Sequence, residues 1–316
     1  MDGRVIEHRP LIAVVGPTAT GKTRRAVCIA RHIGGEIISG DSRQVYRGMD
    51  LGTGKDLEEY QGTPYHLIDV AEPGTKYNLY QFLRDAGRAC SEIEGRGNLS
   101  VVCGGTGLYI ESFLKGTALP EVPENPALRK ELSGKSLEEL TGILASMKRL
   151  HNVTDVDTCQ RAVRAIEIQR YYAEHPDEAA AATDPEPRPA LVIGIAIDRE
   201  TRRRRITERL DARLKAGMAE EVEGLLAKGV SAESLIYYGL EYKYLTLYVT
   251  GQISRDEMRE KLEIAIHQFA KRQMTWFRGM EKRGIPIAWL DHGLSDWGFV
   301  EKVLRLYSRL CGKSGL

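Results

Sequence analysis

The segment GPTATGKT at residues 16–23 combines backbone and side chains that suit a phosphate. Four of its residues fit the pattern G-x-x-x-x-G-K-[ST]: Gly16, Gly21, Lys22 and Thr23. Glycines let the backbone wrap around an oxyanion, the lysine adds a mobile cation, and the threonine hydroxyl suits Mg²⁺. The apolar run LIAVV precedes the segment and a helical stretch follows it. The segment predicts binding of a di- or triphosphate, such as a nucleotide, with Mg²⁺, but does not by itself predict hydrolysis.

Two more polar segments follow apolar runs that read as strands. The first, GDSRQVYRGMD, places Asp41 and Ser42 directly after such a run, and the second, CGGTGLYI, contains Thr106. Because the carboxyl ends of parallel strands open on one crevice, we expect Asp41, Thr106 and the phosphate loop to surround one ligand. The structural alternatives are a helix cap at Asp41 and a simple connector at residues 104–107.

The elements that would position these residues can be read from hydrophobic runs. Apolar β-rich runs occur at residues 11–15, 36–40, 66–70, 99–103, 190–197 and 285–290. Several are nearly continuous in Val, Ile and Leu, as expected for strands covered by helices on both faces. Helical stretches separate them, including long amphipathic ones at about 199–228 and about 254–282. The predicted fold is α/β, a P-loop NTPase-like parallel sheet flanked by helices.

The alternation of strands and helices breaks between the fourth and fifth strands. There the sequence is first rich in proline, then helical and polar, and it closes with HPDEAAAATDPEPRPA, which favours a mobile loop. We therefore predict a mostly helical insertion domain at residues 116–189. Residues 1–115 and 190–316 would form the catalytic core with its C-terminal helices.

Composition narrows the class of protein. The 316 residues are 42% hydrophobic and 28% charged, with a net charge of +1, so a nucleic-acid partner needs a local basic surface. The first residues have no signal-peptide pattern, and no apolar run is long enough to span a bilayer. Five scattered cysteines without a C-x-x-C pair argue against disulfides and zinc. We expect a cytoplasmic monomer without a membrane partner.

Taken together, the motifs resemble those of the tRNA dimethylallyltransferases, also called tRNA isopentenyltransferases or IPP transferases. The matching pieces occur in family order over almost the whole chain: GPTATGKT, SGDSRQVYRGMDLGTGK, HLIDV, GGTGLYI, QRAVRAIEI, DRETRRRRITERLDARLKAG and AKRQMTWFRG. The resemblance implies transfer of a dimethylallyl group from dimethylallyl diphosphate to N6 of the adenosine next to the anticodon of tRNA, position 37, with release of diphosphate.

The resemblance also assigns roles in the reaction. It implies that Asp41 is the general base for the adenine amine and that Thr106 touches the reacting centre and the diphosphate. Breaking the allylic C–O bond leaves negative charge on the diphosphate, which Mg²⁺ and cationic side chains would stabilise. The implied diphosphate-binding residues are Gly16, Thr18, Ala19, Thr20, Gly21, Lys22, Thr23 and Arg205, with Thr23 as the metal ligand.

A third set of residues is implied to bind tRNA: Asp41, Ser42, Arg43, Gln44, Gln160, Arg161, Arg164, Lys243, Lys271, Arg272, Gln273 and Arg278. Arginines supply affinity through phosphates, while aromatic faces suit an unstacked base. A solvated basic helix face is the alternative for Arg161 and Arg164, and also for Arg202–Arg205. Trp276 is either a core residue or a stacking platform.

Three features depart from the family pattern. Glu241 in YYGLEYKYLTLY replaces a glycine of a Gly-Tyr-Lys/Arg stretch, which would put an acid on a surface expected to meet RNA. The insertion has NVTDVDTCQ in place of Asp-Pro elements, and Arg43 stands where an apolar residue is common. The predicted catalytic crevice is unaltered, whereas the predicted RNA-binding periphery differs.

Other functions remain open on the sequence alone. An adenylate isopentenyltransferase would modify free AMP, ADP or ATP, and the altered segment around Glu241 favours it. A P-loop kinase would use the same phosphate loop with ATP as donor and a hydroxyl acceptor beside Asp41. An RNA-binding relative without catalysis is a further alternative, against which the intact Lys22, Asp41 and Thr106 argue.

Overall fold

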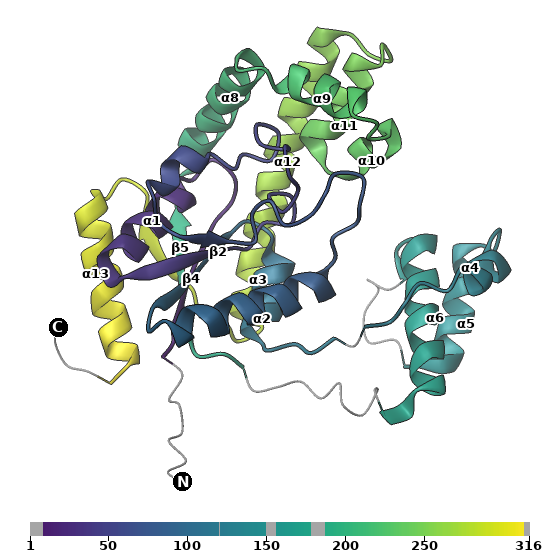
Figure 1. Ribbon diagram of the computed structural model, residues 1–316, viewed down its shortest axis with the longest axis horizontal. Coiled ribbons are helices and arrows are strands. Elements are labelled where there is room, and N and C mark those ends of the chain that lie inside the picture. Colours follow the sequence, from purple (N-terminus) through teal and green to yellow (C-terminus); the bar gives the residue numbers. More distant parts are fainter. Residues whose placement is uncertain (1–8, 120, 150–155, 178–186, 313–316) are drawn as a thin grey trace. The chain divides into compact units, whose positions relative to one another are not determined.

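Strand β1 (Leu11–Val15) is buried at every position, as the apolar run LIAVV predicts for a central parallel strand. A computed structural model describes residues 9–119, 121–149, 156–177 and 187–312 (Figure 1). The chain divides into two compact units, Met1–Thr117 with Glu186–Leu316, and Ala118–Pro185. The first unit contains the phosphate loop and the sheet.

The described residues of the first unit form one six-stranded sheet in which every neighbouring pair is parallel. Its other strands are β2 (Gly35–Ser39), β3 (Tyr65–His66), β4 (Leu99–Gly104), β5 (Ala190–Ala196) and β6 (Ala288–Asp291). The order is β3-β2-β4-β1-β5-β6, so the topology reverses beside β1. In open parallel sheets ligands bind at such a switch point, beyond the carboxyl ends of the strands.

Helices cover both faces of this sheet (Figure 1). The helices of the first unit are α1 (Lys22–Ile33), η1 (Leu57–Tyr60), α2 (Leu79–Gly95), α3 (Gly107–Leu114), α8 (Arg199–Lys215), α9 (Met218–Ala227), α10 (Ala232–Tyr237), α11 (Leu240–Val249), α12 (Arg255–Lys282) and α13 (Asp296–Leu310). Of these, α9 and α10 pack on α11, which packs on α12. Alternate residues of β1 enter two different clusters: Ile12 and Val14 pack with α1 and α13, whereas Ala13 and Val15 pack with the helices of the opposite face. This arrangement confirms the predicted α/β fold.

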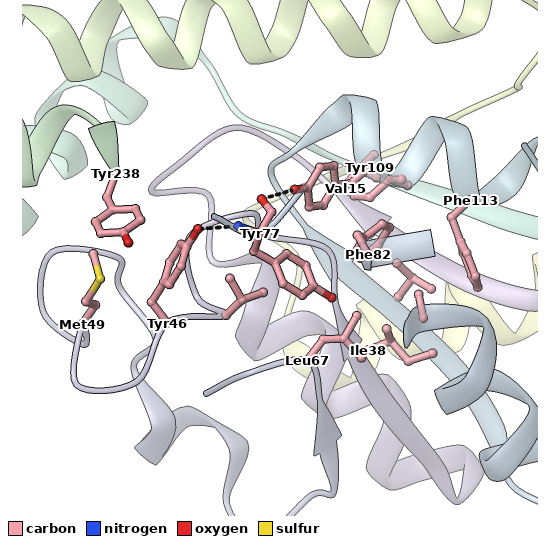
Figure 2. Close-up of a cluster of buried hydrophobic side chains, with 14 of the residues drawn as sticks. Val15, Ile38, Tyr46, Met49, Leu67, Tyr77, Phe82, Tyr109, Phe113 and Tyr238 are labelled. Atoms are coloured by element: carbon pink, nitrogen blue, oxygen red, sulfur yellow. Dashed lines mark hydrogen bonds between the residues drawn. The ribbon is translucent and has the colours of Figure 1, made fainter. Parts of the chain in front are cut away.

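The cluster on the second face contains several aromatic side chains that hold loops against the sheet. Figure 2 shows Tyr46, Tyr77 and Phe82 packed together, with Tyr238 next to Tyr46. The hydroxyl of Tyr46 accepts the backbone N–H of Tyr77 at 2.9 Å, and the ring of Phe82 stacks on Tyr109 with 4.4 Å between centroids. These contacts fix the segment after β2, which leads to the predicted site.

Two predictions about elements were wrong. The strand expected at 66–70 ends at His66, because Leu67 and Asp69 have positive φ values of 65° and 56°, which a strand cannot accommodate. The helix expected at 199–228 is divided into α8 and α9, because Gly217 has a φ of 102° and ends the first helix. The long helix expected at 254–282 is confirmed as α12.

The second unit contains three helices among its described residues: α4 (Pro126–Leu132), α5 (Leu137–Met147) and α6 (Cys159–Glu174). They enclose a small apolar core with Leu140, Leu144 and Ile166 at its centre. Most of the predicted loop in HPDEAAAATDPEPRPA lies outside the described residues. No helix that the structure describes, in either unit, is long and apolar enough to cross a membrane.

A buried acid joins β2 to the neighbouring strand ends. Glu36 is 4% exposed, and its carboxylate accepts hydrogen bonds from Arg96 at 2.9 and 2.8 Å and from Asn98 at 2.8 Å. It also contacts Nε2 of His66 at 2.7 Å. The hydrogen bonds from Arg96, helped by those from Asn98 and His66, outweigh burial and lower the pKa of Glu36 to about 2.

Glu36→Gln tests this contact through the pH dependence of stability. A carboxylate with a lowered folded-state pKa stabilises the fold above its unfolded pKa, and that stabilisation is lost as the pH falls toward the folded value. We expect the variant to lose about 1–3 kcal/mol of unfolding free energy at neutral pH. Its stability should also fall less steeply than that of wild type between about pH 5 and pH 2.

Urea unfolding at several pH values measures both effects. Glu301→Gln is the matched control, because Glu301 forms an exposed helical ion pair with Arg305 and should change stability by only about 0.5 kcal/mol. Equal pH slopes for wild type and Glu36→Gln would contradict the assignment.

Candidate active site

The phosphate loop lies between β1 and α1, at the carboxyl edge of the sheet. Ala19 and Gly21 have φ values of 63° and 79°, and the glycine adopts this left-handed conformation without a steric penalty. The Thr20 hydroxyl donates to the Pro17 carbonyl at 2.9 Å, which closes the loop on itself. Helix α1 begins at Lys22, so its free N–H groups face the space that the loop surrounds. This geometry can bind an anion.

A cavity of about 720 Å³ opens above this loop. Of the predicted site residues, these line it: Thr18, Ala19, Gly21, Lys22, Thr23, Asp41, Ser42, Arg43, Gln44, Thr106, Arg205, Arg272 and Gln273. The predicted convergence of the phosphate loop, Asp41 and Thr106 on one space is thus found in the structure.

Asp41 and Thr106 lie on two loops that are tied to each other. The backbone N–H of Arg43 donates to Oδ1 of Asp41 at 2.9 Å, and the N–H of Ser42 donates to Oγ1 of Thr106 at 3.0 Å. The N–H of Thr106 donates to the Gly40 carbonyl at 3.3 Å. Asp41 therefore stabilises a turn after β2 and caps no helix, so the capping alternative is wrong.

Gln273 of α12 joins the phosphate loop to the glycine-rich turn after β4. Its Oε1 accepts the N–H of Thr18 at 2.9 Å, and its Nε2 donates to the Gly105 carbonyl at 2.9 Å. The side chain is buried, and a methyl group added at Gly105 would lie 2.5 Å from Nε2. Gln273 thus holds two halves of the site together, and its predicted contact with tRNA stays a prediction.

Gln44 has a similar bracing role on the other side of the cavity. Its Oε1 accepts the Ser39 hydroxyl at 2.9 Å, and its Nε2 donates to the Gly54 carbonyl at 3.0 Å. The segment it reaches is held from α9 as well, because the Glu221 carboxylate accepts the N–H groups of Asp50 and Leu51 at 2.8 Å. The loop between β2 and η1 is therefore anchored at both ends.

Helix α8 contributes a row of three arginines at four-residue spacing: Arg205, Arg209 and Arg213. Of these three, only Arg205 was predicted for the diphosphate site; Arg209 and Arg213 were not, although the four-residue spacing itself indicates one helix face. Arg209 and Arg213 both pair with Asp56, the latter at 3.0 Å. Burial raises the pKa of Asp56, but the two guanidinium groups outweigh it and hold that pKa below its ordinary value. Arg205 has no ion pair with any residue of the described ranges.

The cavity carries a surplus of positive charge. Six cationic side chains line it, against the four carboxylates of Asp41, Asp56, Glu59 and Glu241. Burial lowers the pKa of Lys22 and raises the pKa values of Glu59 and Glu241. Burial therefore disfavours the charged form of the lysine as well as the charged forms of the two glutamates. An anionic ligand would offset the excess.

Glu241 does not lie where the sequence suggested. It was expected on an outer RNA-facing surface, but it lines the cavity, because α11 begins at Leu240 directly after Gly239, whose φ is 129°. Arg213 and Arg209 oppose the effect of burial on its pKa, which remains raised. The departure from the family pattern is therefore inside the site.

One wall of the cavity is apolar. It includes Leu108, Ile266, Phe269 and Trp276. A methyl group added at Gly107 would lie 2.2 Å from the ring of Trp276, so the indole packs directly on the first residue of α3. Trp276 is 39% exposed, which places it on the cavity wall and excludes the core alternative.

The other predicted residues lie outside the cavity lining. Gly16 and Thr20 are buried within the phosphate loop, whereas Lys243, Lys271 and Arg278 are exposed on α11 and α12. The three predicted residues of the second unit, Gln160, Arg161 and Arg164, are all on α6.

The two arginines of α6 differ in their contacts. Arg161 is largely exposed and pairs with Asp157 at 2.5 Å. Arg164 pairs with the buried Glu167 and donates to the Val122 carbonyl at 2.7 Å. Arg164 therefore already has a structural role, and Arg161 is the more accessible of the two.

Comparison with known proteins identifies the family. The family model described as IPP transferase matches residues 44–280, and a second, described as isopentenyl transferase, matches residues 10–69. The tRNA dimethylallyltransferase 2 of Bacteroides fragilis is 59% identical, over 90% of this chain and 93% of its own length. The chain belongs to the IPP transferase family.

Other relatives agree with this assignment. The tRNA dimethylallyltransferase 2 of Trichlorobacter lovleyi is 53% identical over 94% of the chain and 97% of its own length. A solved tRNA isopentenylpyrophosphate transferase from Staphylococcus epidermidis is 33% identical, with a TM-score of 0.69, covering 96% of this chain and 99% of that one. A eukaryotic dimethylallyltransferase, 20% identical over 97% of this chain and 81% of its own, shows the same fold with a TM-score of 0.80.

Gln273→Leu tests whether this IPP transferase depends on the bridge between its two loops. The variant leaves the Thr18 N–H and the Gly105 carbonyl without partners at little change in side-chain volume. We expect a loss of about 1–3 kcal/mol in stability, and roughly tenfold weaker binding of inorganic diphosphate with Mg²⁺. Calorimetry measures the affinity, with Gln268→Leu, at an exposed position of the same helix, as the control. Equal affinity in the two variants would contradict the bridging role.

Proposed function

We propose that the protein transfers a dimethylallyl group from dimethylallyl diphosphate to N6 of adenosine 37 of tRNA and releases diphosphate. The observation that carries this proposal is the cavity, which brings a phosphate loop, a carboxylate and an apolar wall together. Relatives named tRNA dimethylallyltransferase, up to 59% identical over nearly all of the chain, support the choice of donor and acceptor.

The donor would place its diphosphate in the phosphate loop and its prenyl tail against the apolar wall. Cleavage of the allylic C–O bond leaves positive charge on carbon and negative charge on the diphosphate. Lys22 and Arg205, which both line the cavity, would stabilise the leaving group where its charge develops. Trp276 lines the same cavity, and its ring would lie near the cationic carbon, where an aromatic ring stabilises positive charge.

The acceptor amine would approach Asp41. The exocyclic amine of adenine is a poor nucleophile until a proton is removed, and a half-buried carboxylate within hydrogen-bond reach suits that task. One oxygen of Asp41 already accepts the Arg43 N–H, which fixes its orientation, and the other, which has no hydrogen bond among the described residues, would accept from the amine. Thr106 accepts the N–H of Ser42, the residue after Asp41, at 3.0 Å.

The residues present fit a magnesium ion beside the diphosphate. Thr23 lines the cavity, and Mg²⁺ prefers oxygen ligands, combining one or two protein groups with waters and phosphate oxygens. Thr23 would hold the ion, whose chemistry when bound is to neutralise charge on the leaving diphosphate.

Transfer RNA would be held by basic side chains around the cavity. Arg272 lines it, Lys271 and Arg278 are exposed on the same helix, and Lys243 is exposed on α11. Arg161 would add a phosphate contact from the second unit. An enzyme that modifies tRNA in this way would work in the cytoplasm.

The direct test supplies dimethylallyl diphosphate labelled in its prenyl group, with either tRNA or AMP as acceptor. We expect label in the tRNA, at the adenosine beside the anticodon, and none in AMP. Label in AMP alone would support the adenylate isopentenyltransferase, and phosphate transfer from ATP would support the kinase.

Asp41→Asn tests the base within the same assay. The amide keeps the shape and can still bind the amine, but it cannot take the proton. We expect single-turnover transfer to slow by about 10²- to 10⁴-fold, equivalent to roughly 3–5 kcal/mol of barrier, while affinities for tRNA and donor change far less. A transfer rate within about threefold of wild type would contradict the assignment.

A further inference from the structure

An arginine and a tyrosine meet beside Asp41 in a way that the proposed chemistry does not use. The guanidinium carbon of Arg43 lies 5.5 Å from the ring centroid of Tyr237, within the range of a cation–π contact. Arg43 lines the cavity, and its own N–H fixes Asp41 at 2.9 Å. Its side chain therefore connects the loop after β2 to the end of α10.

Tyr237 is exposed but rests on a rigid base. It is 53% exposed, and its ring meets the buried Tyr238 edge-on at 6.0 Å between centroids. The ring centroid of Tyr238 in turn lies 4.3 Å from that of Tyr46. The Tyr238 hydroxyl donates to the Thr75 carbonyl at 2.7 Å. Both tyrosines are labelled in Figure 2. An exposed aromatic ring on a fixed support loses little conformational freedom when a ligand stacks on it.

We propose that Arg43 and Tyr237 form a stacking surface for a nucleobase that flanks the acceptor adenosine. This inference rests on the proposed function. An adenine whose amine reaches Asp41 must leave its stack, so a neighbouring base loses a stacking partner. The flanking base is one nucleotide from the acceptor adenosine, and Arg43 is two residues from Asp41. A base next to the acceptor would therefore lie near Arg43. Guanidinium planes and tyrosine rings are the groups on which proteins stack unpaired RNA bases.

The pair is also suited to this ligand by charge. A guanidinium over an aromatic ring brings positive charge to the mouth of the cavity, next to the phosphates on either side of the flanking base. A contact to phosphate alone would need the arginine but not the exposed ring. The ring is therefore the part of the surface that separates stacking from simple charge attraction.

The test is a double-mutant cycle between protein and RNA, read out by binding. The RNA is an anticodon stem-loop, either intact or with an abasic site immediately 5′ or 3′ of the acceptor adenosine. Wild type, Tyr237→Ala and Tyr237→Phe are titrated with each RNA by fluorescence anisotropy. Tyr65→Ala is the matched control, because Tyr65 is 41% exposed and packs on the buried Tyr60 at 4.8 Å without lining the cavity.

We expect Tyr237→Ala to weaken binding of intact RNA by roughly five- to hundredfold, and Tyr237→Phe and Tyr65→Ala to change it less than about twofold. One of the two abasic RNAs should bind wild type more weakly than intact RNA does, by a similar factor. Tyr237→Ala should bind that abasic RNA as well as wild type does, because the base that stacks on the ring is already missing. Arg43→Lys keeps the positive charge but removes the planar guanidinium group. It should weaken binding of intact RNA more than binding of that abasic RNA, by a smaller factor than Tyr237→Ala does.

Equal losses with intact and both abasic RNAs would overturn the inference, since a structural or phosphate-binding role acts regardless of the base. Unchanged binding of intact RNA by Tyr237→Ala would overturn it too. Diphosphate affinity and thermal unfolding identify a misfolded variant, and Arg43→Lys, titrated with the same three RNAs, then carries the test. Failure of wild type to prenylate any RNA would instead overturn the proposed function, so the two failures are distinguishable.

Discussion

The site depends on holding several cations in a partly buried space with too few carboxylates to balance them. Six cationic side chains line the cavity against four acids, and Asp56 already engages Arg209 and Arg213. Burial lowers the pKa of Lys22, so its charge is costly until an anion arrives. A diphosphate bound among these groups supplies that anion. The same cationic side chains then stabilise the additional negative charge that forms when diphosphate leaves.

The rest of the fold places reactive groups around that anion. Parallel strands bring the phosphate loop and the loops after β2 and β4 to one edge of the sheet. Gln273, which lies 255 residues after Thr18 in the sequence, joins two of these loops, and Gln44 and Glu221 fix the third. Because each brace uses backbone groups of the loops, the geometry around Asp41 depends on the helices that carry the braces as much as on the sheet.

The parts of the site that could be predicted from the sequence are short segments that directly follow a strand. The phosphate loop, Asp41 and Thr106 each follow a strand, so pattern and topology were enough to bring them together. Arg213 was missed although its four-residue spacing from Arg209 was visible. The positions of Tyr237 and Glu241 follow from packing on Tyr238 and from the start of α11, and the ends of β3 and α8 follow from backbone angles at Leu67 and Gly217. These features depend on tertiary contacts or single φ values, which hydrophobic patterns do not contain.

If this phosphate loop holds a leaving group, the bond broken in the reaction is carbon–oxygen. Dimethylallyl diphosphate carrying ¹⁸O in the bridging ester oxygen tests it directly, by mass spectrometry of the products after transfer to tRNA. We expect the ¹⁸O to be recovered in the released diphosphate. Recovery of ¹⁸O in dimethylallyl alcohol or another prenyl product would mean that phosphorus–oxygen cleavage occurred, and would contradict it.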